Sequence, residues 1–168
     1  MVSEKFYVIM TEQNKFYLTK EGLERIKKEY GRMKNLRLLK TKGEAPRTWQ
    51  SEDLNPEYLA FQEDLSLFEV RINELEHILN NVEIIKAPQK DSRGIVRLGA
   101  TVTLEEADGQ ANEFMIVGTL EANPGEGKIS SESPVGKAIL GRKIGEEVLI
   151  TSPIAVRYKI KKIRYQLG

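Results

Sequence analysis

The chain contains no cysteine and a single histidine, His77, among its 168 residues. The absence of cysteine excludes disulfide scaffolds, thiol nucleophiles and the zinc sites that depend on thiolate ligands. One histidine cannot build a multi-histidine metal site. Aromatic residues are also few, at 7% of the chain, with Trp49 the only tryptophan. These absences leave carboxylates and basic side chains as the groups best able to carry chemistry.

Long apolar runs and a net charge of one sign are missing as well. The N-terminal run Phe6–Met10 has only five apolar residues, too few for a secretory signal. No run approaches the ~20 residues that span a bilayer, so we expect a cytoplasmic protein with no membrane partner. Lys and Arg total 26 against 25 for Asp and Glu. The overall basic excess typical of dedicated DNA-binding proteins is therefore absent.

The near-zero net charge hides two neighbouring segments of opposite sign. Residues 15–42 hold ten basic and three acidic side chains, whereas residues 44–76 hold nine acidic and two basic ones. Adjacent segments of opposite charge predict two elements that pair with each other. Pairing alone, with solvated outer faces and no partner, is one interpretation of these charges. A basic face that meets an anionic partner is the other.

Hydrophobic spacing indicates that both segments are helical. In the acidic segment the apolar spacing is 4, 3, 4, 3, 4, 3, which predicts a coiled-coil seam of three heptads. Its members are Phe61, Leu65, Phe68, Ile72, Leu75, Leu79 and Val82. The basic segment has the shorter series Leu23, Ile26, Tyr30 and Met33. Thr19 stands where a helix N-cap is expected. We expect an antiparallel coiled-coil hairpin with helices of about 25 residues.

The segment between these helices is expected to form the tip of the hairpin. Residues 42–58 include a glycine and two prolines, which are unfavourable inside a helix. They also hold Trp49 and the acidic residues Glu52, Asp53 and Glu57. A purely structural role for Asp53 is to cap the N-terminus of the second helix, and Ser51 or Asn55 could also take that role.

The second half of the chain has the pattern of a small β-rich domain. Strands are expected near residues 95–104, 114–117, 145–150 and 156–163, with Asp108-Gly109 as a hairpin turn. Ser133-Pro134 is a helix-start signal, and Gly141 ends the short helix predicted over residues 135–140. The fold class is therefore α+β. The expected divisions are an N-terminal extension (1–15), the hairpin (16–86) and the β-rich domain (87–168).

Several motifs resemble the bacterial transcription elongation factors GreA and GreB. The block Ser130–Val148 is similar to the C-terminal signature of that family, and Thr19–Gly22 is similar to its helix entry. Asp53-Leu54, followed by Asn55–Tyr58, resembles its acidic tip. Family tips usually read Gly-Asp-Leu-x-Glu-Asn-x-Glu-Tyr, whereas here Ser51-Glu52 precede Asp53 and no x-Glu pair precedes Asn55. One of the two functional acids of the family therefore has no aligned position.

The resemblance implies an accessory factor and not an enzyme. Gre factors bind bacterial RNA polymerase, insert the tip into its secondary channel and stimulate cleavage of the 3′ end of backtracked RNA. Asp53, with Glu52 or Glu57, would be the carboxylates donated to the polymerase site, where Asp53 and Glu52 would help to hold Mg²⁺. No cofactor of its own is expected. The alternative is a Gre-like regulator that enters the channel without stimulating cleavage.

The resemblance also implies contact surfaces. The second half would have a fold like the FK506-binding prolyl isomerases and would dock on polymerase through the residues Ser133, Pro134, Gly136 and Lys137. The basic helix would face the phosphates of the nascent RNA through Arg32, Lys34, Arg37 and Lys40. Few aromatic residues occur after residue 86, which favours docking over isomerase activity. We expect a monomer.

Overall fold

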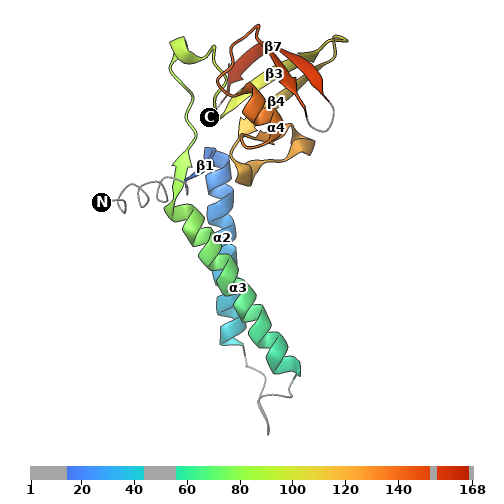
Figure 1. Ribbon diagram of the computed structural model, residues 1–168. Coiled ribbons are helices and arrows are strands. Elements are labelled where there is room, and N and C mark those ends of the chain that lie inside the picture. The colour runs from blue at the N-terminus through green and yellow to red at the C-terminus, as the bar shows by residue number, and fades with distance from the viewer. Residues whose placement is uncertain (1–14, 44–55, 152–154, 167–168) are drawn as a thin grey trace, which may run out of the picture. The chain divides into compact units, whose positions relative to one another are not determined.

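The computed structural model describes residues 15–43, 56–151 and 155–166 (Figure 1). The chain divides into two compact units. We call Leu23–Asn81 the hairpin unit, and Met1–Gly22 together with Val82–Gly168 the sheet unit. The backbone contacts thus group the first turn of the first helix with the sheet unit. The domain boundaries expected at residues 15/16 and 86/87 stay a prediction.

Two long helices, α2 (Lys20–Lys42) and α3 (Pro56–Asn80), contain the charged and heptad-patterned segments. The start of α2 is capped as expected, because the Gly22 N–H donates to Thr19 Oγ1 at 3.0 Å. A side-chain acceptor at this position satisfies one of the amide groups that the first turn leaves without a backbone partner. Pro56, whose fixed φ suits a first helical position, begins α3.

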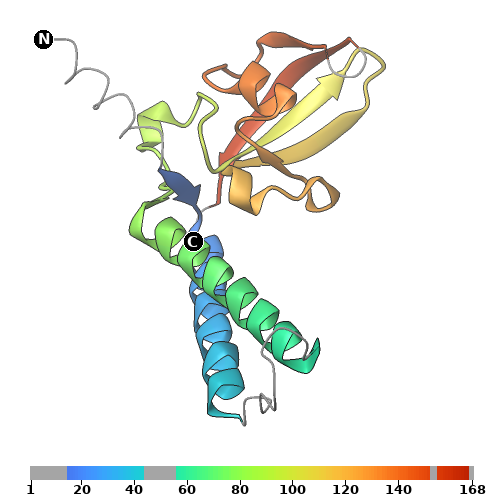
Figure 2. The same ribbon diagram turned by 60° about the horizontal axis from the view of Figure 1, so that its bottom comes forward.

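The helices run antiparallel, as three cross-helix contacts establish. Tyr30 donates to Glu76, Arg71 donates to Glu29, and Lys40 is ion-paired with Asp64. Going forward along α2 from Glu29 and Tyr30 to Lys40, the partners on α3 go backward, from Arg71 and Glu76 to Asp64. Figure 2 shows the two helices side by side. The predicted antiparallel hairpin is confirmed.

The apolar seam is centred on Leu75, which is fully buried. Ile26 of α2 and Ile72 and Ile78 of α3 are also buried, whereas Phe61, Leu65 and Phe68 are only half-buried. The predicted seam is wrong at its C-terminal end. Val82 lies beyond α3, in a strand, and Ile78 is more buried than Leu79. The reason is that α3 ends at Asn80, where the heptad pattern continues in sequence but the helix does not.

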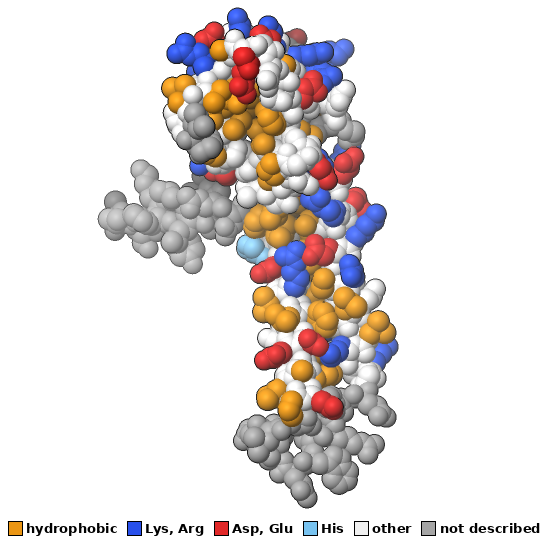
Figure 3. Space-filling model, turned by 90° about the vertical axis from the view of Figure 1, so that its right-hand side faces the viewer, with side chains coloured by type: hydrophobic (Ala, Val, Ile, Leu, Met, Phe, Trp, Pro, Cys, Tyr) orange, Lys and Arg blue, Asp and Glu red, His pale blue; other side chains and the backbone are white. Residues whose placement is uncertain are grey.

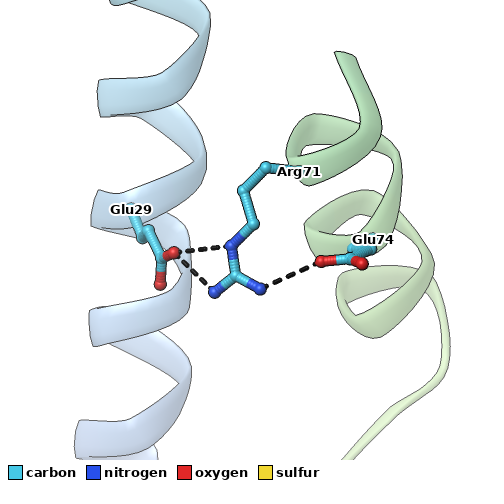
Figure 4. A network of polar contacts seen from close by, with 3 residues as sticks. All are labelled: Glu29, Arg71 and Glu74. Carbon is cyan, nitrogen blue, oxygen red and sulfur yellow. Dashed lines mark hydrogen bonds and ion pairs between the residues drawn. The ribbon is translucent and has the colours of Figure 1, made fainter. Parts of the chain in front are cut away.

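Charged side chains join the helices beside this seam (Figure 4). Arg71 donates through Nε and Nη2 to Glu29 Oε1 at 2.8 and 2.5 Å, and through Nη1 to Glu74 Oε2 at 3.1 Å. The hydrogen bond to Glu29 is the main cause of a raised pKa of the Arg71 guanidinium. Pairs this exposed typically contribute less than about 1 kcal/mol. They therefore favour the register of the helices, while the apolar seam supplies most of the stability.

The sheet unit contains a five-stranded sheet in the order β5-β4-β3-β7-β6. Its strands are β3 (Ala100–Glu106), β4 (Ala111–Val117), β5 (Lys128–Ser130), β6 (Glu147–Ile150) and β7 (Val156–Tyr165), and its short helix is α4 (Pro134–Ile139). All neighbours are antiparallel except β4 and β5. Ile139 of α4 belongs to the same buried cluster as Val102, Ile116 and Ile160 of the sheet. The predicted α+β class is confirmed.

The hairpin turn predicted at Asp108-Gly109 in this unit is confirmed. Gly109 has φ +86° in the turn between β3 and β4, and the Gln110 N–H donates to Asp108 Oδ1 at 3.0 Å. The first strand begins later than expected, at Ala100, because Ile95 forms only an isolated bridge with Lys143. Strand β5 was not expected. Among its described residues, the unit also has the single-turn helices η2 (Lys90–Ser92), η3 (Thr119–Glu121) and η4 (Pro124–Glu126).

A second, two-stranded sheet is absent from the sequence-based prediction. Strand β1 (Phe16–Leu18) pairs in parallel with β2 (Val82–Ile84). The Ile85 N–H extends this pairing by donating to the Leu18 carbonyl at 2.8 Å. A strand leaving the hairpin near Glu83 and Ile84 is predicted from the sequence, but strands of three residues carry too little pattern to show which distant segment they pair with. No helix within the described residues has an apolar stretch long enough to cross a membrane.

Replacement of Leu75 by Ala should destabilise the hairpin unit strongly. Leu75 is 0% exposed and Leu67, on the same helix, is 67% exposed. Removing a buried leucine side chain and leaving a cavity costs about 2 to 5 kcal/mol. Chemical denaturation followed by helical circular dichroism should show that loss for Leu75→Ala. The matched Leu67→Ala variant should change stability by less than about 0.5 kcal/mol. Equal effects of the two substitutions would contradict the assignment of the seam.

Candidate functional site

The expected tip lies largely between the described segments. Glu52 and Asp53, with Trp49, fall in residues 44–55 and so lie outside the described residues. Glu57 is described: it is exposed and lies in the first turn of α3. A carboxylate there interacts favourably with the positive end of the helix dipole. Within the described parts of the chain, no three potential ligand side chains are grouped as a metal site would require.

The four basic residues expected to face RNA do not have equivalent surroundings. Lys40 is half-buried, ion-paired with Asp64 and 5.7 Å from the centre of the Phe61 ring. Its ammonium group thus contributes to helix pairing. Arg32, Lys34 and Arg37 are exposed, and Lys34 lies 5.1 Å from the ring centre of Tyr30 on the same helix. Figure 3 shows acidic and basic side chains interspersed along the hairpin on the face in view.

The block that resembles the family's C-terminal signature surrounds α4. The Gly136 N–H donates to Ser133 Oγ at 3.0 Å, and the Ser133 hydroxyl donates to the Ser130 carbonyl at 2.7 Å. Gly136 is buried, and a Cβ there would stand 2.2 Å from the Ser130 oxygen. Ser133 and Gly136 therefore have structural tasks inside the turn. These tasks account for a serine and a glycine at the two positions without any contact to a binding partner.

Pro134 and Lys137 are the exposed members of this block. Lys137 forms an ion pair with Glu132 at 3.1 Å, and both side chains are largely exposed. Such a pair is easily exchanged for contacts to a partner because water already screens it. Of the four residues expected to dock on polymerase, these two are the exposed ones, whereas Ser133 is half-buried and Gly136 is buried.

Three aromatic side chains from the second half of the chain pack against the core of the sheet unit. Phe114, Tyr158 and Tyr165 lie beside the buried cluster. The Tyr165 hydroxyl donates to the Ile95 carbonyl at 2.5 Å and accepts the Arg97 N–H at 3.1 Å. Burial is the main cause of a raised pKa of the Tyr165 phenol. These contacts tie the segment before β3 to the end of β7.

One residue with an evident task was missed by the sequence analysis. Glu121 is buried and accepts hydrogen bonds from the Thr19 N–H at 2.6 Å and from the Thr19 hydroxyl at 2.5 Å. The two residues are 102 positions apart, so local patterns contain no sign of the contact. The glycine in the helix entry Thr19–Gly22 was the available signal, because a glycine in a helix often marks a close approach.

Comparison with known proteins places both halves in one family. The family model described as the N-terminal part of a transcription elongation factor matches residues 16–84, and the model for the C-terminal part of GreA/GreB matches residues 90–165. Transcription elongation factor GreA of Thermomicrobium roseum is 40% identical over 138 residues, covering 81% of this chain and 88% of that protein. The GreA of Chloroflexus aggregans is 38% identical, covering 88% and 96%.

Solved structures were matched as well. The GreA factor homolog 1 protein of Thermus thermophilus is 27% identical, with a TM-score of 0.40 and coverage of 89% of this chain and 99% of that one. The sequence matches are the stronger finding, since they extend through the hairpin, the helix entry and the block around α4. The chain belongs to the GreA/GreB family of transcription elongation factors.

Proposed function

We propose that this chain binds RNA polymerase and places the acidic tip of its hairpin in the secondary channel, where it stimulates cleavage of the 3′ end of backtracked RNA. The observation that carries the proposal is the family match over both halves of the chain, residues 16–84 and 90–165. Hydrolysis belongs to the polymerase, and this chain is an accessory factor that acts as a monomer in the cytoplasm.

The hairpin suits delivery of the tip into a narrow channel. Helices of 23 and 25 residues are each about 35 Å long at 1.5 Å per residue. Two paired helices are also narrow, since a single helix with its side chains is only about 10 to 12 Å across. The acidic residues Glu52, Asp53 and Glu57 all belong to the end where α2 and α3 are joined.

Carboxylates at the tip fit the chemistry of the polymerase site. Asp53 is the principal group, because it keeps the Asp-Leu context of the family tip, and Glu52 is its partner. Carboxylate oxygens are preferred ligands of Mg²⁺, which in the polymerase site stabilises the attacking and leaving oxygens. Asp53 orients the attacking water by accepting a hydrogen bond. Glu57 has mainly a structural task in the first turn of α3.

The exposed charges have separate tasks in this scheme. Pro134 and Lys137, beside α4, contact the polymerase and anchor the chain. Arg32, Lys34 and Arg37 face the phosphates of the extruded RNA, where cationic side chains add affinity that falls with salt. Lys40 contributes less to RNA contact because its charge is paired with Asp64.

The altered tip supports one alternative. Because Asn55 directly follows Asp53-Leu54, the second acid of the family pattern has no aligned position. A factor that enters the channel with one well-placed carboxylate could regulate the polymerase without stimulating cleavage.

Replacement of Asp53 by Asn tests the proposed chemistry. The side chains are nearly isosteric, so folding and polymerase binding should be kept, while an amide is a much poorer ligand for Mg²⁺. Cleavage of a stalled, backtracked complex should slow by roughly 10²-fold. Glu52→Gln should also slow cleavage, whereas the matched Glu57→Gln variant should mainly lower stability. If Asp53→Asn cleaves like the parent, the mechanism is wrong. If the parent binds in the channel but never stimulates cleavage, the regulator alternative is correct.

Reversal of one exposed charge tests the docking surface. Lys137→Glu should raise the Kd for core polymerase roughly tenfold, because it places a repelled charge at the proposed contact. Its melting temperature should stay near that of the parent, since Lys137 is exposed. Lys159→Glu, an exposed reversal on β7, is the matched control and should bind normally. Normal binding by Lys137→Glu, measured by co-elution and titration, would argue against docking through this block.

A further inference from the structure

Two hollows on the sheet unit adjoin each other at Tyr17. The first, of about 420 Å³, has Lys15 and Leu120 in its wall, and the second has a volume of about 500 Å³. Because Tyr17, Ser131 and Glu132 line both hollows, the two form one groove, which we call the Tyr17 groove. Tyr17 and Leu120 have 38% and 40% of their surface exposed. Large apolar side chains exposed around one concave surface are typical of a binding site.

The second hollow combines apolar walls with one cation. Ile95, Leu98 and Leu140 line it, and each is only half-buried. Arg97 lines it too, is exposed, and takes part in none of the ion pairs among the described residues. An occupant that fits this hollow must therefore bring apolar side chains to cover the walls and a carboxylate to meet the guanidinium.

The chain itself leads into the Tyr17 groove. Its described residues begin at Lys15, which lies in the wall of the first hollow and is ion-paired with Glu83 of β2 at 3.0 Å. Residues 1–14 precede Lys15 and lie outside the described residues. Met10 can lie up to about 17 Å from Lys15, since an extended chain spans about 3.3 to 3.6 Å per residue. The second hollow, with Tyr17 in its wall, is therefore within reach of the residues just before Lys15.

The composition of residues 1–14 matches the chemistry of the groove. Residues 6–10 are Phe, Tyr, Val, Ile and Met, the longest unbroken apolar run in the chain. Exposure of such a run to water is unfavourable, and burial against the walls of the groove removes that cost. Glu4 precedes the run and Glu12 follows it, so a carboxylate is available for Arg97 at either end.

We propose that residues 6–10 bind in the Tyr17 groove of the same chain, with apolar side chains in the second hollow and the carboxylate of Glu4 or Glu12 paired with Arg97. The inference concerns the sheet unit alone and does not depend on the proposed action on polymerase. Because the segment is covalently attached next to the groove, its effective concentration there is high, and a contact that is weak between separate molecules is well populated.

Paramagnetic broadening in the full chain tests this placement. The chain has no cysteine, so Ile9→Cys provides a single site for a nitroxide label. The amide NMR signals of Leu98 and Leu140, in the wall of the second hollow, should lose intensity with the oxidised label relative to the reduced one. Gly109 is the internal control and should keep its intensity, because it lies beyond the far end of β3, about 20 Å along the strand from Ala100.

Two exposed leucines provide matched variants. Leu120→Asp places a charge in the groove, whereas Leu149→Asp makes the same change on β6, in the wall of neither hollow. Broadening at Leu98 and Leu140 should be lost in Leu120→Asp and kept in Leu149→Asp. Val8→Asp should abolish the broadening from the other side of the contact, and it leaves the residues of the groove unchanged, so a folding defect in Leu120→Asp does not decide the result.

Three outcomes count against the proposal. Full intensity at Leu98 and Leu140 in the parent would show that residues 6–10 do not occupy the groove. Broadening that persists in Val8→Asp would show that the label is close without any apolar contact. Broadening that arises only between a spin-labelled copy and a separate isotope-labelled copy would assign the groove to a second molecule of this chain.

Discussion

A carboxylate buried against the first turn of a helix is the constraint on which the arrangement of the sheet unit around β1 depends. The charge of Glu121 is tolerated because Thr19 supplies two donors and the helix dipole supplies a favourable field. That arrangement in turn requires glycine at position 22, because a side chain there would occupy the space of the carboxylate. The residue types at positions 19, 22 and 121, which come from two distant segments, therefore depend on one another.

The hairpin depends on a different kind of interaction. Its charge pattern is conspicuous in the sequence, yet the ion pairs of Arg71 and Lys40 are partly exposed to water and each adds little free energy. Burial of a few apolar residues around Leu75 supplies most of the stability. The charges select the antiparallel register, since Arg71 meets Glu29 and Lys40 meets Asp64 only in that pairing.

The block around α4 illustrates why similarity within a family is not the same as contact with its partner. Ser133 and Gly136 are explained by capping and by a close backbone approach. Pro134 and Lys137 have exposed surfaces that such tasks do not require. A docking proposal therefore rests on the exposed pair, and substitution of the other two would test stability and not binding.

The sequence alone determined the α+β class, the two paired helices, the Thr19 cap, the Asp108-Gly109 turn and the start of α4. Each of these depends on neighbours within a few positions, through periodicity, capping or backbone conformation. The same local information, together with the family resemblance, predicts Asp53, Glu52 and Glu57 as tip carboxylates, and both their place and their task stay a prediction. Tertiary structure decided the parallel pairing of β1 with β2, the end of the seam at Ile78 and the partnership of Thr19 with Glu121. Those features join segments that are about 60 to 100 residues apart, or depend on where a helix ends, and no local pattern encodes which distant groups will meet.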